Sequence, residues 1–121
     1  RIKHFARSFR HAMRGLRYAF RYEKNFQNEI GVALIVVVAM IYFKVTRSEA
    51  IILILVIFGV LVTELFNTMI ERMVDILKPR IHPYAKLIKD LVAASVLLAS
   101  ILALIIGLII FIPYVLSSIK Y

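Results

Sequence analysis

One segment of twelve residues carries the side chains best suited to chemistry. It reads E-L-F-N-T-M-I-E-R-M-V-D, from Glu64 to Asp75, and continues directly from a long apolar run. Spacings of three and four place its polar residues on one helical stripe, roughly 100° wide: Glu64, Asn67, Thr68, Glu71 and Asp75. Carboxylates at a membrane edge are costly and normally serve ion or substrate chemistry. Two of them on one stripe can hold a divalent cation that also ligates phosphate oxygens.

The composition is that of an all-α membrane protein with a single domain, residues 1–121. The chain is 62% hydrophobic and has a mean hydropathy of +0.87, which is too apolar for an ordinary soluble domain. It contains no cysteine, so disulfides and thiolate metal sites are excluded. The net charge of +9 indicates anionic lipid or nucleotide phosphate as partners. Nucleic acid is not expected, because the basic residues flank the apolar runs.

Three apolar runs follow a basic N-terminal segment. In residues 1–24, cations recur at spacings of three and four on one face and apolar side chains on another, which predicts an amphipathic helix lying in the membrane interface. The predicted membrane helices cover residues ~28–45, ~50–77 and ~89–116. The connection at 44–49 is short and makes the first two an antiparallel hairpin. The connection at 76–89 contains two prolines and is expected to be a loop or interfacial turn.

The third apolar run also contains a ridge of small residues spaced four apart: Ser95, Ala99, Ala103 and Gly107. Such ridges let helix backbones approach closely in lipid. An ordinary alanine-rich membrane helix has the same appearance, so both interpretations stay open.

The distribution of charge predicts the orientation. Of the 16 Lys and Arg, only Lys44, Arg47 and Lys120 lie on the side opposite to the N-terminus. The positive-inside rule therefore places the N-terminus in the cytoplasm and the C-terminus outside. Of the seven acidic residues, only Glu49 lies on the far side. The others gather at the cytoplasmic boundary, where ATP and magnesium are available.

Further polar residues flank the predicted spans. Lys89 and Asp90 either neutralise each other or divide their roles, with Lys89 on a phosphate and Asp90 supporting it. Glu23 and Glu29 are solvated charges if taken alone, but with the stripe they supply the oxygen ligands that magnesium needs. His82 is expected to be a loop residue rather than a catalytic base. No glycine-rich nucleotide motif is present.

Three functions fit these features. A lipid kinase would use Glu64 as the base for a lipid hydroxyl and Glu71 with Glu23 for magnesium on ATP phosphates. Because Glu64 and Glu71 are two turns apart, we expect their side chains to project about 10 Å apart along the helix axis. A small cation or proton transporter would use its carboxylates as a relay. A membrane adaptor would need only the basic helix.

Three motifs resemble the small prokaryotic diacylglycerol kinase family. The Glu64–Asp75 segment resembles the family signature E-x-x-N-[ST]-x-I-E-x-x-V-D, and H-P-Y-A-K-L-I-K-D at 82–90 resembles the second signature. R-H-A-M-R-G-L-R-Y-A-F-R-Y-E-K-N at 10–25 is similar to the N-terminal surface-helix motif. The motifs appear in order and span nearly the whole chain. The spacing H-P-x-A-K is more similar to the undecaprenol kinase branch than to the diacylglycerol branch.

The resemblance implies a homotrimer of the bacterial cytoplasmic membrane, with a surface helix and three transmembrane helices in each subunit. It implies transfer of the ATP γ-phosphate to a membrane lipid alcohol, with Mg²⁺ as cofactor. By the same resemblance Glu64 is the base, Asn67 and Asp90 support catalysis, and Glu23 and Glu71 hold the metal. Positions assigned to nucleotide are Lys89, Glu23, Glu71, Arg7, Arg14 and His11. Positions assigned to the lipid are Glu64, Glu29 and Asn67, and His82 and Asp75 match family positions without an assigned role.

The predicted orientation can be tested with single cysteines, because the chain has none of its own. In intact cells, an impermeant thiol reagent should label the Ile119→Cys variant and leave the Lys3→Cys variant unlabelled until the cells are lysed. The reverse pattern would show that the orientation is wrong.

Overall fold

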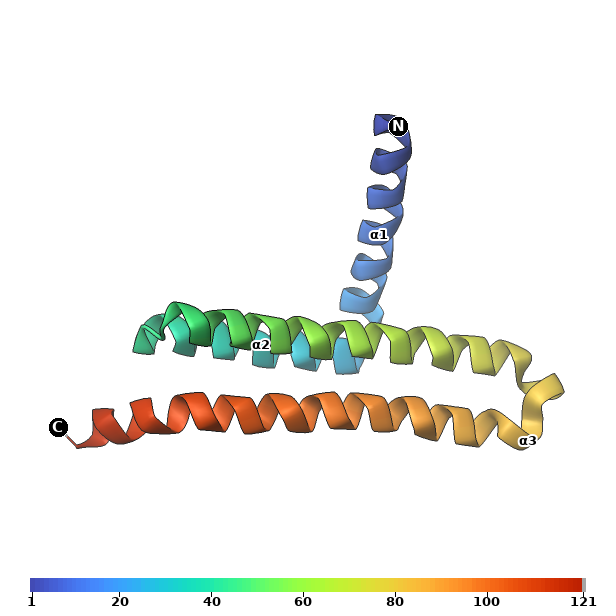
Figure 1. The fold of residues 1–121 in the computed structure, drawn as a ribbon. Helices are drawn as coiled ribbons and strands as arrows, with labels where there is room; N and C mark the ends of the chain where they lie inside the picture. The colour runs from blue at the N-terminus through green and yellow to red at the C-terminus, as the bar shows by residue number, and fades with distance from the viewer. Residues whose placement is uncertain (121) are drawn as a thin grey trace.

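The chain folds into helices alone in a computed structural model that describes residues 1–120; the side chains of Pro79 and Ile81 lie outside that description. The helices are α1 (Ile2–Tyr22), α2 (Lys24–Phe43) and α3 (Arg47–Ile119). Figure 1 shows α2 and α3 running alongside one another, with α1 standing away from them at a steep angle. The predicted all-α class is confirmed.

Helix α3 folds back on itself and supplies two membrane spans. They are Arg47–Lys78, here called the first arm, and His82–Ile119, the second arm. A straight helix of this length would extend about 110 Å, yet the Tyr114 hydroxyl near one end contacts Glu49 near the other. The ribbon accordingly reverses where it changes from yellow to orange (Figure 1). With α2 (Lys24–Phe43), the protein has three helices long and apolar enough to cross a membrane, as predicted.

Residues 76–89 are helical rather than a loop, and the predicted turn takes the form of a reversal within this helical segment (Figure 1). Helical structure continues across Pro83, although a proline usually bends or ends a helix. The third span therefore begins well before residue 89. Lys89 and Asp90 lie within a helix rather than at its start.

The junction of α1 and α2 consists of one non-helical residue, Glu23, with extended backbone angles (φ −100°, ψ 107°). The first membrane helix thus begins at Lys24, earlier than predicted. The side-chain amide of Gln27 donates hydrogen bonds to the carbonyl oxygens of Phe20 (2.9 Å) and Arg21 (3.1 Å). Because the last carbonyls of a helix lack partners within it, these bonds close the end of α1 and fix the bend.

The turn between α2 and α3 is shorter than the predicted 44–49. Lys44 has a left-handed backbone (φ 52°) and ends α2. The Thr46 hydroxyl accepts a hydrogen bond from the Glu49 backbone N–H (3.2 Å), and the Glu49 carboxylate accepts one from the Thr46 N–H (2.9 Å). This reciprocal capping box starts α3 at Arg47, inside the segment expected to be turn.

Side chains from all three spans meet at this same end. The Tyr114 hydroxyl of the second arm donates to Glu49 Oε1 of the first arm at 2.5 Å. The Phe43 ring of α2 lies 5.8 Å from the Tyr114 ring and 6.1 Å from the Phe111 ring, centroid to centroid. Tilted aromatic pairs at such distances attract one another. The spans are therefore joined at the end predicted to face outward.

Few apolar side chains are buried within the chain. The buried ones are Ala19, Phe26, Leu53, Val74, Ala85 and Ile110. Most large apolar side chains of the spans are exposed, which in lipid carries no hydrophobic cost, because lipid tails are as apolar as the side chains. These faces are available to lipid or to other copies of the chain.

The contact between Tyr114 and Glu49 should stabilise the α3 hairpin. Tyr114→Phe keeps the ring beside Phe43 but removes the hydroxyl, so we expect a lower unfolding temperature in detergent, measured by intrinsic fluorescence. Tyr42→Phe is the matched control, because the Tyr42 side chain is exposed and its hydroxyl makes no hydrogen bond to the described residues. Equal unfolding temperatures for the two variants would show that the hydrogen bond contributes no stability.

Candidate functional site

Two acidic side chains and one amide form a polar group on the first arm, here called the acid–amide group: Glu64, Asn67 and Glu71, of which Glu71 is partly buried. Asn67 Nδ2 donates to Glu64 Oε2 at 3.2 Å and to Glu71 Oε1 at 3.1 Å. Glu64 and Asn67 are only 3% and 7% exposed. Helix spacings of three and four make the three side chains neighbours, as the sequence predicted. An amide carries two N–H donors, and here each serves a different carboxylate.

Glu64 and Glu71 both accept a hydrogen bond from Asn67 Nδ2, so their carboxylates are closer than the backbone spacing suggests. The sequence predicted side chains about 10 Å apart from the helical rise. Because Glu64 Oε2 and Glu71 Oε1 both contact Asn67 Nδ2 within 3.2 Å, these two oxygens are clearly nearer than that. The prediction was wrong because it treated the side chains as perpendicular to the axis, whereas both lean toward the amide. The neighbouring Thr68 is also buried.

Glu29 of α2 is the residue from another helix that lies next to Glu64; the two carboxyl groups are close enough to interact directly. One oxygen of Glu29 is buried and has no hydrogen-bond partner among the described residues. Glu29 also lines a groove of about 420 Å³ between α2 and the two arms of α3, together with apolar side chains that include Val36, Leu53 and Val60. Of the described residues in the lining of this mostly apolar groove, Glu29 is therefore the one that is charged.

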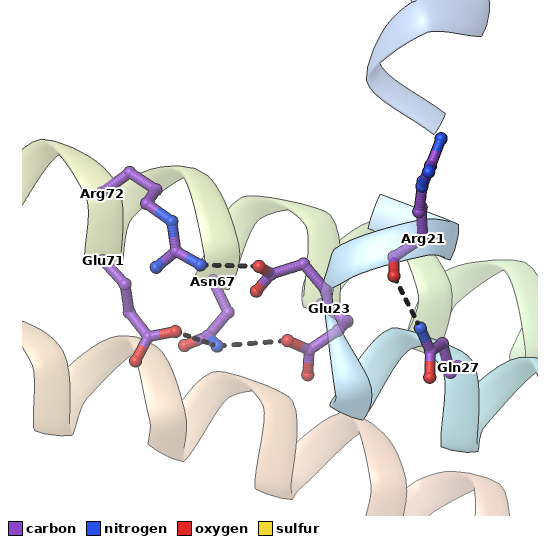
Figure 2. A network of polar contacts seen from close by, with 7 residues as sticks. Arg21, Glu23, Gln27, Asn67, Glu71 and Arg72 are labelled. Carbon is purple, nitrogen blue, oxygen red and sulfur yellow. Dashed lines mark hydrogen bonds and ion pairs between the residues drawn. The ribbon is translucent and has the colours of Figure 1, made fainter. Parts of the chain in front are cut away.

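Glu23, at the junction of α1 and α2, contacts the first arm through an ion pair. Arg72 Nη2 lies 2.6 Å from Glu23 Oε2, and the side chain of Glu23 is 14% exposed against 49% for Arg72. Figure 2 shows the Arg72 guanidinium directed at Glu23, beside Asn67 and Glu71. The predicted metal ligands Glu23 and Glu71 thus lie on the same side of the first arm (Figure 2). Arg72, which follows Glu71 in the chain, links Glu23 to this arm.

The neutralising pair considered for Lys89 and Asp90 is not formed. Lys89 Nζ instead lies 2.6 Å from Asp75 Oδ1 on the first arm, and Asp90 Oδ2 lies 3.1 Å from Lys86 Nζ one turn earlier. Consecutive residues of a helix point about 100° apart, so Lys89 and Asp90 face different neighbours. The Lys89–Asp75 pair links the two arms of α3 near their reversal.

Several predicted residues are not brought to the acid–amide group. Arg7, His11 and Arg14 are exposed on α1, and within the described residues they make no hydrogen bond or ion pair with another helix. Their assignment to nucleotide stays a prediction. His82 is exposed at the start of the second arm, in a helix rather than the expected loop.

Magnesium fits the oxygen donors of this region. No group of three or more acidic or histidine side chains close enough to hold a metal occurs within the described residues. Magnesium commonly uses one or two carboxylates, with phosphates and waters completing its coordination. Glu71 Oε1 accepts a hydrogen bond from Asn67, and Glu23 Oε2 accepts one from Arg72. The second oxygen of each remains for a cation.

Arg72 is part of this site but was not among the residues predicted from the sequence. The signal was present, because Arg72 directly follows Glu71 and is the one cation within the E-L-F-N-T-M-I-E-R-M-V-D segment. Its partner could not be identified, since Glu23 is 49 residues away in the chain. Only the fold brings the two together.

Comparison with known proteins identifies the family. Residues 10–111 match the family model described as prokaryotic diacylglycerol kinase. The chain is 38% identical to the undecaprenol kinase of Bacillus subtilis, over 93% of this chain and 91% of that protein. It is 36% identical to the diacylglycerol kinase of Synechocystis, over 91% of this chain and 63% of that protein. It is 30% identical to the diacylglycerol kinase of Haemophilus influenzae, over 81% of this chain and 83% of that protein. The chain therefore belongs to the prokaryotic diacylglycerol kinase family and is a lipid kinase.

Proposed function

We propose that the protein transfers the γ-phosphate of ATP to the hydroxyl of a membrane lipid alcohol, with undecaprenol favoured over diacylglycerol and Mg²⁺ required. The observation that carries this proposal is the acid–amide group, in which a nearly buried carboxylate, Glu64, and a second carboxylate, Glu71, are held by one amide at the end of an apolar span. The transporter and adaptor alternatives are not favoured by membership of a kinase family.

The preference for undecaprenol rests on the relatives. The undecaprenol kinase shares 38% identity over 91% of its own length, whereas the two diacylglycerol kinases share less. The groove of about 420 Å³ supports an apolar acceptor, since its volume lies in the range of ligand sites, ~300–1,000 Å³. Glu29 in its lining is adjacent to Glu64, so a chain lying in the groove would bring its hydroxyl toward the acid–amide group.

Glu64 acts as the general base in this proposal. Asn67 occupies Glu64 Oε2, which leaves Oε1 to accept the hydroxyl proton. The alcohol oxygen then forms a bond to the γ-phosphorus, while the bond between that phosphorus and the bridging oxygen breaks and ADP leaves. Phosphoryl transfer needs little covalent chemistry from a protein, so positioning and charge neutralisation are the main contributions of this chain.

Glu71 and Glu23 would hold the magnesium of the nucleotide. Bound Mg²⁺ would neutralise charge on the β- and γ-phosphates. Lys89 is proposed to approach a phosphate, with Asp75 and Asp90 orienting Lys89 and Lys86 near the reversal of α3. On α1, Arg7, His11 and Arg14 are the proposed contacts to the rest of the nucleotide.

The proposed assembly is a homotrimer in the bacterial cytoplasmic membrane, with the N-terminus and the site cytoplasmic and the C-terminus external. Two features support further copies of the chain. Most large apolar side chains of the spans are exposed, and the small residues Ala103 and Gly107 line the groove rather than a filled core. Small residues in membrane helices permit close approach of another helix.

The acceptor is tested by ATP turnover of the detergent-purified protein in mixed micelles. Turnover should depend on added lipid and should be faster, at equal mole fraction, with undecaprenol than with diacylglycerol. Faster turnover with diacylglycerol would overturn the acceptor assignment. ATP hydrolysis unaffected by either lipid would overturn the proposed reaction.

The role of Glu64 predicts a selective loss in kcat. Glu64→Gln keeps the size of the side chain and its hydrogen bond with Asn67 but removes the base, so kcat should fall by roughly 10²–10⁴ with little change in ATP affinity. Steady-state kinetics with both substrates measure this. Near-normal lipid phosphorylation by the variant would exclude Glu64 as the base.

The role of Glu71 predicts a different defect. Glu71→Gln should weaken magnesium-dependent nucleotide binding, and raised Mg²⁺ should partly restore activity, because a neutral amide is a poorer ligand. The measurement is the Mg²⁺ dependence of turnover for this variant beside the Glu64→Gln variant. A kcat defect that Mg²⁺ does not relieve would place Glu71 outside the metal site.

A further inference from the structure

Arg72 makes the one ion pair that joins the α1–α2 junction to the first arm within the described residues. Its Nη2 donates to Glu23 Oε2 at 2.6 Å, and Figure 2 shows the guanidinium directed toward that carboxylate. Glu23 is the non-helical residue between two helices, and its backbone is held by hydrogen bonds to Ala19 and from Gln27, both 3.0 Å. Among the described residues, Arg72 alone donates a hydrogen bond to its side chain. The contact with Arg72 therefore has a large share in determining where the Glu23 carboxylate points.

The surroundings of this pair are acidic. Glu64 and Glu71 are bridged by Asn67, and Glu29 lies beside Glu64. Like charges at short range repel in a medium of low dielectric constant. Among the described side chains of this region, Arg72 is the cation that is paired with one of the acids. Without it, Glu23 would be free to turn away from the other carboxylates.

The ion pair with Arg72 uses only one of the two carboxylate oxygens of Glu23. Arg72 contacts Oε2, and no described residue donates a hydrogen bond to Oε1. A planar guanidinium fixes the plane and direction of the carboxylate that it holds, which a flexible ammonium does less well. We infer that Arg72 is a positioning residue for the metal site, which holds Glu23 by Oε2 so that Oε1 is presented to the magnesium of the bound nucleotide.

This inference rests on the proposed assignment of Glu23 to magnesium and adds a residue that acts through it. The energy of the ion pair alone is small, because half-exposed pairs of this kind contribute little to stability. Residues that orient a metal ligand have larger effects on the metal, typically 10–100-fold in affinity. The Mg²⁺ requirement for nucleotide binding therefore reports on positioning by Arg72, whereas the unfolding temperature reports on its contribution to stability.

The test is the Mg²⁺ dependence of nucleotide binding without lipid acceptor. Binding of a fluorescent ADP analogue to the purified protein is titrated with Mg²⁺ for the wild type, Arg72→Gln and Arg72→Lys. We expect Arg72→Gln to require about 10–100-fold more Mg²⁺ for half-maximal binding and Arg72→Lys to fall between it and the wild type. Arg80→Gln is the control, because it removes the same charge from an exposed residue of α3 that makes no ion pair with the described residues.

The outcomes separate this inference from the proposed function. If Glu23→Gln shifts the Mg²⁺ requirement and Arg72→Gln behaves like Arg80→Gln, the inference is overturned while the kinase site stands. If the wild type binds the analogue without any dependence on Mg²⁺, the proposed metal site is overturned together with the inference. If Arg72→Gln does not fold, Arg72→Lys decides, and a Mg²⁺ requirement equal to that of the wild type contradicts positioning by the guanidinium.

Discussion

The amide of Asn67 allows two carboxylates to sit side by side at the end of an apolar span. Burying an acidic group without a donor is strongly unfavourable, and burying two next to each other adds their mutual repulsion. One nitrogen meets both needs because its two hydrogens point to opposite sides along the helix. This arrangement requires an unbroken helix from Glu64 to Glu71, and it explains why the first arm of α3 continues as a helix beyond its apolar part.

Patterns within a single helix could be read from the sequence, and contacts between helices could not. The spacing of Glu64, Asn67 and Glu71 predicted a shared face, since helical geometry alone determines it. The pairing of Lys89 with Asp75 depends on how the two arms of α3 pack against each other. The spacing of residues within one helix carries no information about that packing. The helical course of residues 76–89 was missed because prolines usually signal a break, whereas helix α3 continues through this segment.

The two ends of the membrane-spanning helices are held together by different chemistry. At the end predicted to face outward, Phe43 packs against aromatic side chains and Tyr114 contacts Glu49. At the other end, the contacts are ion pairs and the acid–amide group. The aromatic contacts join the spans at one end, and polar contacts join them at the other.

Glu23 couples the direction of helix α1 to the direction of a carboxylate. It is the single non-helical residue between α1 and α2, and hydrogen bonds on both sides hold its backbone. The same backbone angles therefore set the course of α1, which is about 30 Å long, and the direction of the side chain that pairs with Arg72. A change in these angles would displace the far end of α1 and the Glu23 carboxylate together.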